Sequence, residues 1–123
     1  QACEGEKGPF VSRWRSLEPR ESDVLKAVLR FCHIHPAVAW CERMNVGAQE
    51  IEGRWVKFGF PGCSDIIGQL KDGRFLAIEC KSATGRLKPE QRAFLAKVGG
   101  AGVAIVARDV RDVAAVLDAL LSK

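Results

Sequence analysis

The stretch Pro61–Ser82, PGCSDIIGQLKDGRFLAIECKS, decides the fold of this chain. Two apolar segments, IIGQL and FLAIEC, flank the tripeptide Lys71-Asp72-Gly73, which favours two strands joined by a three-residue hairpin loop with Gly73 in the left-handed position. In such a hairpin Leu70 pairs with Arg74, and each further pair steps back by one residue on either strand. The register therefore predicts that Asp65 lies directly opposite Glu79.

The predicted register brings two carboxylates face to face. Strand alternation places Glu79 and Lys81 on one face of the sheet and Cys80 on the other. Opposed carboxylates repel each other, so we expect a positive charge between Asp65 and Glu79, either Lys81 or a divalent cation. Oxygen ligands suit Mg²⁺ or Mn²⁺, and the backbone carbonyl of Cys80 is a further candidate ligand.

Two interpretations of this cluster stay open from the residues alone. In a catalytic metal site, Lys81 positions or helps to deprotonate a water, or supports the charge on a phosphate. In a purely structural arrangement, Lys81 forms a salt bridge with Asp65 or Glu79 at the rim of the sheet. The matching cross-strand Asp65, behind a Pro-Gly turn, favours the catalytic interpretation.

Outward from the hairpin, apolar periodicity and turn residues predict the remaining elements. They are a helix at 21–35 ended by Pro36, β-rich stretches at 37–47 and 54–60 around a polar segment with Gly53, a helix from Pro89 to Gly99-Gly100, a buried strand at 103–107, and a closing helix capped by Asp109. This order predicts an α/β domain whose mixed sheet is flanked by helices.

Length and composition fit one globular domain with a mildly basic surface. The chain has 123 residues, 47% hydrophobic and 28% charged, with a net charge of +4, which is compatible with a polyanionic partner. We expect neither a membrane span nor a secretory signal, because no apolar run is long enough. Five cysteines without a CxxC pair favour free thiols in a reducing cytoplasm.

The first twenty residues differ in character from the rest. Gly, Pro and charged residues up to Pro19 predict an N-terminal arm over 1–20, followed by the domain over 21–123. Arg13, Arg15 and Arg20, interleaved with Trp14, suit either a nucleic-acid-binding arm or a dimer-packing segment. Trp40 and Trp55 are expected in the core or in an interface, and His33 and His35 at a helix end, packed or exposed to solvent.

The pattern Asp65…Glu79-Cys80-Lys81, between a leading helix and a following helix and strand, resembles the PD-(D/E)xK nuclease superfamily. Over roughly residues 21–117 the closer resemblance is to its VRR-NUC branch, the virus-type replication-repair nucleases. The segments that carry the resemblance are 43–47, 61–65, 79–81, 87–91, Gly100 and 103–113. One departure is that Ser64, rather than a proline, directly precedes Asp65, while Pro61 lies four residues upstream.

The resemblance implies a restriction-endonuclease-like core of αβββαβ type and a metal-dependent phosphodiesterase. Its metal ligands map onto Asp65 and Glu79, and its catalytic lysine maps onto Lys81. Gln91 matches a family position that orients the site, and Glu21 is the candidate for an acidic residue on the first helix. The resemblance further implies a homodimer that cleaves branched DNA such as Holliday junctions. A free-standing nuclease domain with free thiols suits the cytoplasm of a bacterial or phage-infected cell.

A group of polar and basic residues follows the predicted site and is expected to contact DNA phosphates. The candidates are Ser82, Thr84, Arg86, Lys88 and Arg92. The alternative is a solvated basic loop. Because no helix-turn-helix or zinc finger is visible, we expect recognition of DNA shape rather than of base sequence.

The sequence thus predicts a Mg²⁺- or Mn²⁺-dependent endodeoxyribonuclease, structure-selective and acting on branched or duplex DNA. The alternatives are a nuclease without structure preference, a flap or 5′-end nuclease, and a non-catalytic nucleic-acid-binding or dimerisation module on the same fold. A replication or repair partner of unknown identity is also compatible with so small a nuclease.

Overall fold

A computed structural model describes residues 19–44 and 47–122 of the chain. Its elements are α2 (Glu21–Ile34), β1 (Val38–Arg43), β2 (Gly47–Ile51), β3 (Arg54–Phe58), β4 (Ile66–Leu70), β5 (Phe75–Cys80), α3 (Pro89–Gly99), β6 (Val103–Ala107) and α4 (Val110–Leu121). Apart from Pro19 and Arg20, the predicted N-terminal arm lies outside the described residues, including Arg13, Trp14 and Arg15.

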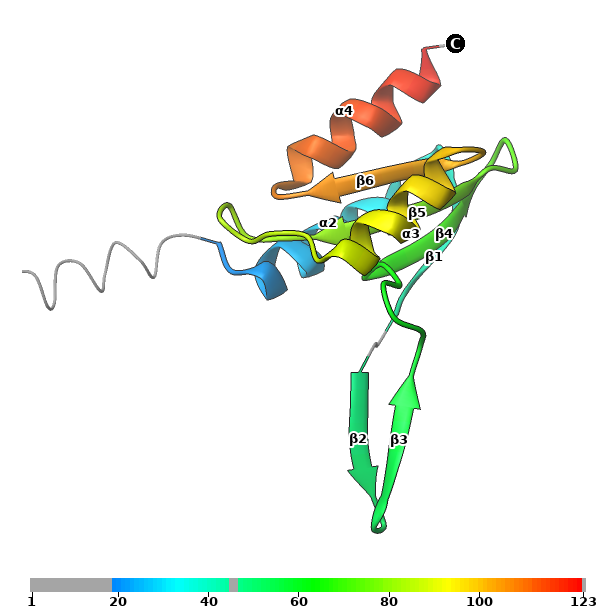
Figure 1. The fold of residues 1–123 in the computed structure, drawn as a ribbon. Coiled ribbons are helices and arrows are strands. Elements are labelled where there is room, and N and C mark those ends of the chain that lie inside the picture. The colour runs from blue at the N-terminus through cyan, green and yellow to red at the C-terminus, as the bar shows by residue number, and fades with distance from the viewer. Residues whose placement is uncertain (1–18, 45–46, 123) are drawn as a thin grey trace, which may run out of the picture.

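The main sheet has four strands in the order β1-β4-β5-β6. β4 runs antiparallel to both β1 and β5, whereas β6 runs parallel to β5. Helices α2 and α4 pack on one face of this sheet and α3 packs on the other (Figure 1). The chain is therefore a single mixed α/β domain whose sheet is flanked by helices, as the sequence predicted.

The hydrophobic core lies between the sheet and the α2–α4 face. Its fully buried side chains are Val28 and Cys32 of α2, Ile66 of β4, Leu76, Ile78 and Cys80 of β5, and Val113 and Leu117 of α4. Burying each Leu or Ile stabilises the fold by about 1.5–3 kcal/mol. This packing fixes β5 at the centre of the domain. Cys32, Cys41, Cys63 and Cys80 are all buried free thiols.

The central hairpin has the predicted register. Ile66 pairs with Ile78 and Gln69 with Phe75, and the Leu70 N–H donates to the Arg74 carbonyl at 2.8 Å. Gly73 has a φ of 98°, the left-handed conformation expected at the end of the three-residue loop. The sequence-based register of this hairpin is therefore confirmed.

The segment between β1 and β4 differs from the prediction. The expected β-rich stretch at 37–47 ends earlier, because β1 stops at Arg43, and the supposed polar spacer contains β2. β2 and β3 pair only with each other, as a separate two-stranded hairpin that projects away from the main sheet (Figure 1). Glu52 and Gly53, with φ of 52° and 77°, form its tight turn. In the described part, five strands thus precede α3 instead of four.

The two tryptophans in this region are not core residues. Trp40 on β1 is 44% exposed and its indole N–H donates to the Gln69 side chain, while Trp55 on β3 is 73% exposed. The prediction of a core position for them was wrong, and the interface alternative remains. At the end of α2, His33 is exposed and its ring contacts the Cys41 carbonyl at 3.3 Å, whereas His35 is buried and its ring contacts the Asp118 carboxylate at 2.8 Å.

The two later helices begin as predicted. Asp109 caps α4 by accepting the Arg111 N–H, and Asp112 in the first turn accepts the Arg108 N–H. Pro89 is the first residue of α3, where its missing N–H costs no helical bond. None of the helices within 19–44 and 47–122 is both long and apolar enough to span a bilayer.

Candidate active site

Asp65 stands at the point where the β4–β5 ladder ends. It directly precedes β4 and lies one step beyond the Ile66–Ile78 pair, opposite Glu79. Its Oδ2 atom accepts the Cys80 N–H at 2.8 Å, and its backbone carbonyl accepts the Met44 N–H at 2.7 Å. The Asp65 carboxylate thus accepts the hydrogen bond that a backbone carbonyl would accept if the β4–β5 ladder continued, and this bond holds it beside β5.

Glu79 is the second carboxylate and is almost completely enclosed, with 2% of its surface exposed. The Lys81 ammonium lies 3.6 Å from its Oε2 atom, and the Gln91 side-chain amide donates to the same oxygen at 2.9 Å. The other oxygen, Oε1, is buried and has no hydrogen-bond partner among the described residues. A buried, unpaired carboxylate oxygen is costly unless something positive contacts it.

The electrostatics of Glu79 reflect this enclosure. Burial, and after it the nearby Asp65 carboxylate, raises the pKa of the Glu79 carboxyl to about 7, although the Lys81 ammonium acts in the opposite direction. The carboxylate of Glu21, the first residue of α2, also raises this pKa. Glu21 is thus near enough to the pair to act on it, although its own side chain is exposed.

Lys81 and Cys80 take opposite faces of β5, as strand alternation requires. Lys81 is 7% exposed on the face of Glu79, whereas the Cys80 thiol is packed in the core. The Cys80 N–H points to the β4 side, where Asp65 receives it, and the carbonyl of a residue in an extended strand points to the same side as its N–H. The Cys80 carbonyl therefore faces the β4 side, where the Asp65 carboxylate lies.

Gln91 connects the first turn of α3 to this cluster. Its side-chain oxygen accepts the Lys88 N–H at 2.9 Å, which caps the helix, and its nitrogen donates to Glu79. One side chain therefore fixes both the start of α3 and the orientation of the buried acid.

The Pro61-Gly62 turn locks the approach to Asp65. Gly62 has a φ of 86°, and a Cβ at this position would overlap the Glu90 carbonyl in the first turn of α3. Ser64, which replaces the expected proline, is fully buried and its hydroxyl donates to the Ile66 carbonyl at 2.9 Å. These contacts hold Asp65 in place without a proline directly before it.

The predicted DNA-contacting residues lie on the segment that runs from Lys81 to α3. Thr84, Arg86, Lys88 and Arg92 are exposed, and Ser82 is half-buried. This segment begins at Lys81, beside Glu79, and ends at the helix that carries Gln91, so its two ends are joined to the carboxylate site.

Two neighbours of the site had not been assigned from the sequence. Cys63 is buried, and its thiol pKa is raised by burial and then by the Glu79 and Asp65 carboxylates, which places it beside them. Arg108 follows β6 and its guanidinium binds carbonyls of the loop after Lys81. The parallel pairing of VAIVA with FLAIEC would have indicated Arg108, since its register position is level with Lys81.

The donor set fits a hard divalent cation. Two carboxylates and one backbone carbonyl are oxygen ligands, and the unpaired Glu79 Oε1 is the atom that a cation would satisfy. Within the described ranges, no cluster of three or more His, Cys, Asp or Glu side chains is arranged to hold a metal. A zinc-type closed site is therefore not present there, whereas Mg²⁺ or Mn²⁺, which keep waters and take substrate oxygens, match a site with few protein ligands.

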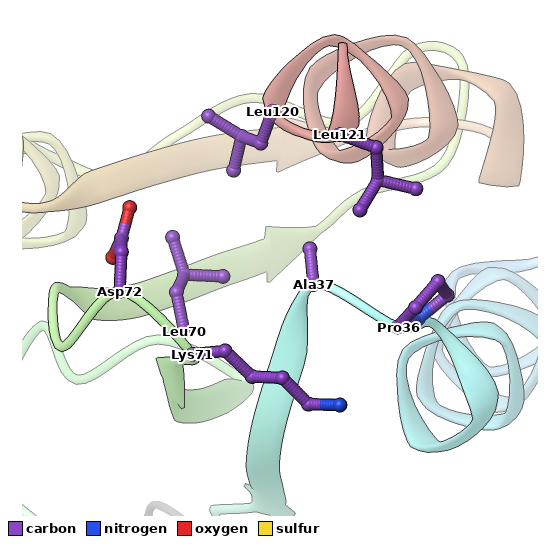
Figure 2. Close-up of a pocket in the computed structure, with 7 residues that line it drawn as sticks. All are labelled: Pro36, Ala37, Leu70, Lys71, Asp72, Leu120 and Leu121. Carbon is purple, nitrogen blue, oxygen red and sulfur yellow. The ribbon is translucent and has the colours of Figure 1, made fainter. Parts of the chain in front are cut away.

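A hollow of about 330 Å³ lies elsewhere, at the far end of β4 (Figure 2). Its wall includes Ala37, Leu70, Leu120 and Leu121, with Lys71 and Asp72 at the hairpin turn. Leu70 and Asp65 are separated by the length of β4, about 17 Å. This hollow is therefore separate from the carboxylate site.

Comparison with known proteins agrees with the geometry. The family model for the VRR-NUC domain matches residues 4–112, which is most of the chain. No match was found among curated proteins or among solved structures. The family match and the paired carboxylates lead to one conclusion: the chain belongs to the VRR-NUC family, a family of nucleases.

Proposed function

We propose that this protein is a divalent-metal-dependent endodeoxyribonuclease with a restriction-endonuclease-like core. Without the projecting hairpin, its elements follow the order α2-β1-β4-β5-α3-β6, which is the αβββαβ pattern that the family resemblance implies. The observation that carries the proposal is the cross-strand pair Asp65 and Glu79 with Lys81 3.6 Å from the buried acid. Such a cluster of charges has little structural use in an otherwise apolar sheet.

Asp65, Glu79 and the Cys80 carbonyl are the proposed ligands of Mg²⁺ or Mn²⁺. A divalent cation bound there supplies Lewis acidity to a phosphate oxygen and lowers the pKa of a coordinated water. Glu79 must lose its proton before it can serve as a ligand, and Lys81 and Gln91 both favour its charged form. The fixed Asp65, already held by the Cys80 N–H, needs little reorganisation to bind.

Lys81 is the proposed catalytic lysine. Its ammonium is enclosed on the same face as Glu79, so it meets a phosphate in an environment that excludes most water. In the proposed reaction, a water gives up a proton to solvent and attacks phosphorus in line, the bond to the 3′ oxygen breaks, and that oxygen takes a proton from solvent, which leaves a 3′-hydroxyl and a 5′-phosphate. Lys81 orients the attacking water or stabilises the charge on the phosphate.

DNA is the proposed substrate, bound by its phosphates. The candidate contacts are the exposed Thr84, Arg86, Lys88 and Arg92 and the half-buried Ser82, on the chain between Lys81 and the first turn of α3, which suits contacts to the DNA backbone rather than to bases. Selectivity for branched DNA is then a matter of shape. Glu21, which affects the charge state of Glu79, is a further candidate participant from α2.

We propose a homodimer as the active form, because resolution of a junction needs two symmetric cuts. The projecting β2–β3 hairpin supports it. An isolated two-stranded hairpin is marginally stable alone, and this one exposes Trp55 (73%) and Ile51 (42%). Between Gly47 and Phe58 the sequence has two acids and two bases, Glu50, Glu52, Arg54 and Lys57, so its charge does not favour a polyanion over a second copy.

The decisive experiment is a cleavage panel with Mg²⁺, Mn²⁺ and EDTA on single strands, duplexes, flaps and four-way junctions. The proposal predicts metal-dependent cutting, fastest on branched substrates, that Asp65→Asn abolishes and the exposed control Asp72→Asn does not. Equal rates on all substrates would instead favour a nuclease without structure preference, and preference for flaps a 5′-end or flap nuclease. DNA binding without cutting in any metal would favour a non-catalytic module.

A further inference from the structure

The loop Ser82–Gly85 is folded around one cation, the guanidinium of Arg108. Its Nη1 atom donates to the carbonyls of Ser82 at 2.6 Å, Gly85 at 2.7 Å and Ala83 at 3.3 Å. The Gly85 N–H donates to the Ser82 carbonyl at 3.2 Å, which closes the loop on itself. Three carbonyls turned toward one point repel each other, so this conformation depends on the positive charge that gathers them.

Arg108 is itself held at both ends. The Lys81 N–H donates to the Ala107 carbonyl at 2.9 Å, which continues the β5–β6 ladder and places Arg108 level with Lys81. The Arg108 N–H donates to Asp112 at 2.8 Å, within the cap of α4. The guanidinium therefore extends from a fixed backbone onto the loop.

The folded loop packs on the Lys81 side chain. A Cβ built on Gly85 would lie 3.5 Å from the Cδ atom of Lys81 and 3.2 Å from the Ser82 hydroxyl oxygen, so the Gly85 backbone lies against the lysine stem. The Lys81 side chain is 9% exposed, and its ammonium stays 3.6 Å from Glu79. A long lysine side chain has about 2 kcal/mol of rotamer freedom to lose, so a wall beside its stem limits where the ammonium can go.

We propose that Arg108 is a positioning residue: it folds the Ser82–Gly85 loop against Lys81 and thereby keeps the Lys81 ammonium at Glu79. The consequence for catalysis rests on the proposed nuclease function, whereas the consequence for the lysine does not. Arg108 touches neither carboxylate, so its effect on the reaction passes through the loop and Lys81.

The test compares Arg108→Met, which keeps a long apolar stem without charge, with Arg108→Lys. A lysine ammonium has three N–H donors for the three carbonyls, so Arg108→Lys should keep the loop. The matched control is Arg111→Met, an exposed arginine in the first turn of α4. Each protein is labelled with a brief pulse of acetic anhydride, and mass spectrometry compares Lys81 with the exposed reference Lys97 in the same sample.

We expect Lys81 in Arg108→Met to be acetylated about tenfold faster relative to Lys97, with parent-like values in Arg108→Lys and Arg111→Met. Single-turnover cleavage by Arg108→Met should fall about 10- to 100-fold while DNA affinity changes less than about threefold. A purely structural role would change the labelling of Lys97 as well. If Arg108→Met does not fold, Arg108→Gln carries the same comparison.

Equal labelling of Lys81 in Arg108→Met and in the parent overturns the proposal, whether or not DNA is cut. Faster labelling with unchanged cleavage by a parent that cuts DNA overturns the catalytic consequence. A parent that cuts no DNA, with Lys81 exposed only by Arg108→Met, supports positioning by Arg108 and overturns the proposed function instead.

Discussion

Gln91 and Glu79 are joined by a hydrogen bond of 2.9 Å from the Gln91 amide nitrogen to the Glu79 Oε2 atom. The same amide group caps α3 through the Lys88 N–H. The first turn of a helix and the buried acid of a strand are therefore oriented by one side chain. Outer partners of this kind affect a metal site although they touch no metal.

Replacement of this glutamine tests that coupling. Gln91→Met keeps the volume but leaves Glu79 Oε2 without its donor, so metal affinity or cleavage rate should fall about 10- to 100-fold. Isothermal titration with Mn²⁺ and single-turnover cleavage measure the two quantities. Gln69→Met, on the exposed face at the far end of β4, is the control and should leave both unchanged. Parent-like Mn²⁺ affinity and cleavage in Gln91→Met would show that the bond only caps the helix.

The stability of the metal-free protein should depend on pH through Glu79. Its pKa is about 7 in the folded chain against 4.5 for an ordinary glutamate, so between these values the folded state binds more protons than the unfolded state. Stability should therefore fall as pH rises from about 4.5 to 7, by at most about 3 kcal/mol. Urea denaturation in EDTA at several pH values measures this slope.

Glu79→Gln should flatten that dependence, because a neutral amide cannot titrate, while the exposed Glu42→Gln should retain it. In the parent, added Mg²⁺ should restore stability mainly at the upper end of the range, where the carboxylate is charged. A slope of the opposite sign in EDTA would contradict the burial of an uncompensated acid.

Removal of the lysine should separate catalysis from folding. Lys81→Met should lower the rate of cleavage at least about a thousandfold, as expected for a group that stabilises the transition state. DNA binding should be nearly unchanged. The substitution should also extend to higher pH the range over which stability falls, because Lys81 lowers the pKa of Glu79. Single-turnover kinetics and the same urea titrations provide both readouts, and Lys71→Met in the hairpin turn serves as control. Cleavage at the parent rate would remove Lys81 from the mechanism.

Alanine substitutions at two glycines with positive φ distinguish the cost of backbone strain from the cost of steric overlap. Gly73→Ala, at a φ of 98° with open space around it, should lower the free energy of unfolding by about 1–2 kcal/mol, the cost of a left-handed conformation for alanine. Gly62→Ala, at a φ of 86°, should lower the free energy of unfolding by about 1–3 kcal/mol more than Gly73→Ala, because its Cβ overlaps the Glu90 carbonyl. Urea denaturation measures the difference. Equal losses would mean that the turn and α3 do not pack as described.

A substitution of Trp55, the exposed aromatic residue of the hairpin, tests the proposed dimer. Trp55→Ser should shift the protein from dimer to monomer in multi-angle light scattering, since Trp55 offers the largest exposed apolar side chain on the hairpin. Ile34→Ser, whose side chain is 78% exposed at the end of α2, is the control and should remain dimeric. A parent that is monomeric both free and on junction DNA would argue strongly against two symmetric cuts.

The central hairpin could be predicted because local chemistry determines it. A three-residue loop with Gly in the last position allows one register, and that register aligns Asp65 with Glu79. Pro89 and Gln91, both in the first turn of α3, likewise predict where this helix begins. In each case, the deciding residues are neighbours in the chain.

The β2–β3 hairpin was missed for the corresponding reason. Glu52-Gly53 is an uncommon pair for a tight turn that needs positive φ at both positions, and Gln49 and Glu50 have low strand propensity. Arg108 was missed because its partners are backbone carbonyls of a distant loop, and the available signal was indirect: the parallel register of β6 beside β5 places Arg108 level with Lys81. The exposure of Trp55 follows from the projection of the hairpin, which propensity does not encode.

The place where that hairpin leaves the sheet has an engineering consequence. The chain departs after Arg43 and returns at Ile66, and these two residues are register partners, with the Met44 N–H bound to the Asp65 carbonyl at 2.7 Å. The excursion is thus closed at its base, next to the carboxylates, and doubling its length would cost only about 0.6 kcal/mol in closure entropy. The Glu52-Gly53 tip lies at the far end of this closed hairpin, so residues inserted there would lengthen the hairpin without altering the strands that carry Asp65 and Glu79.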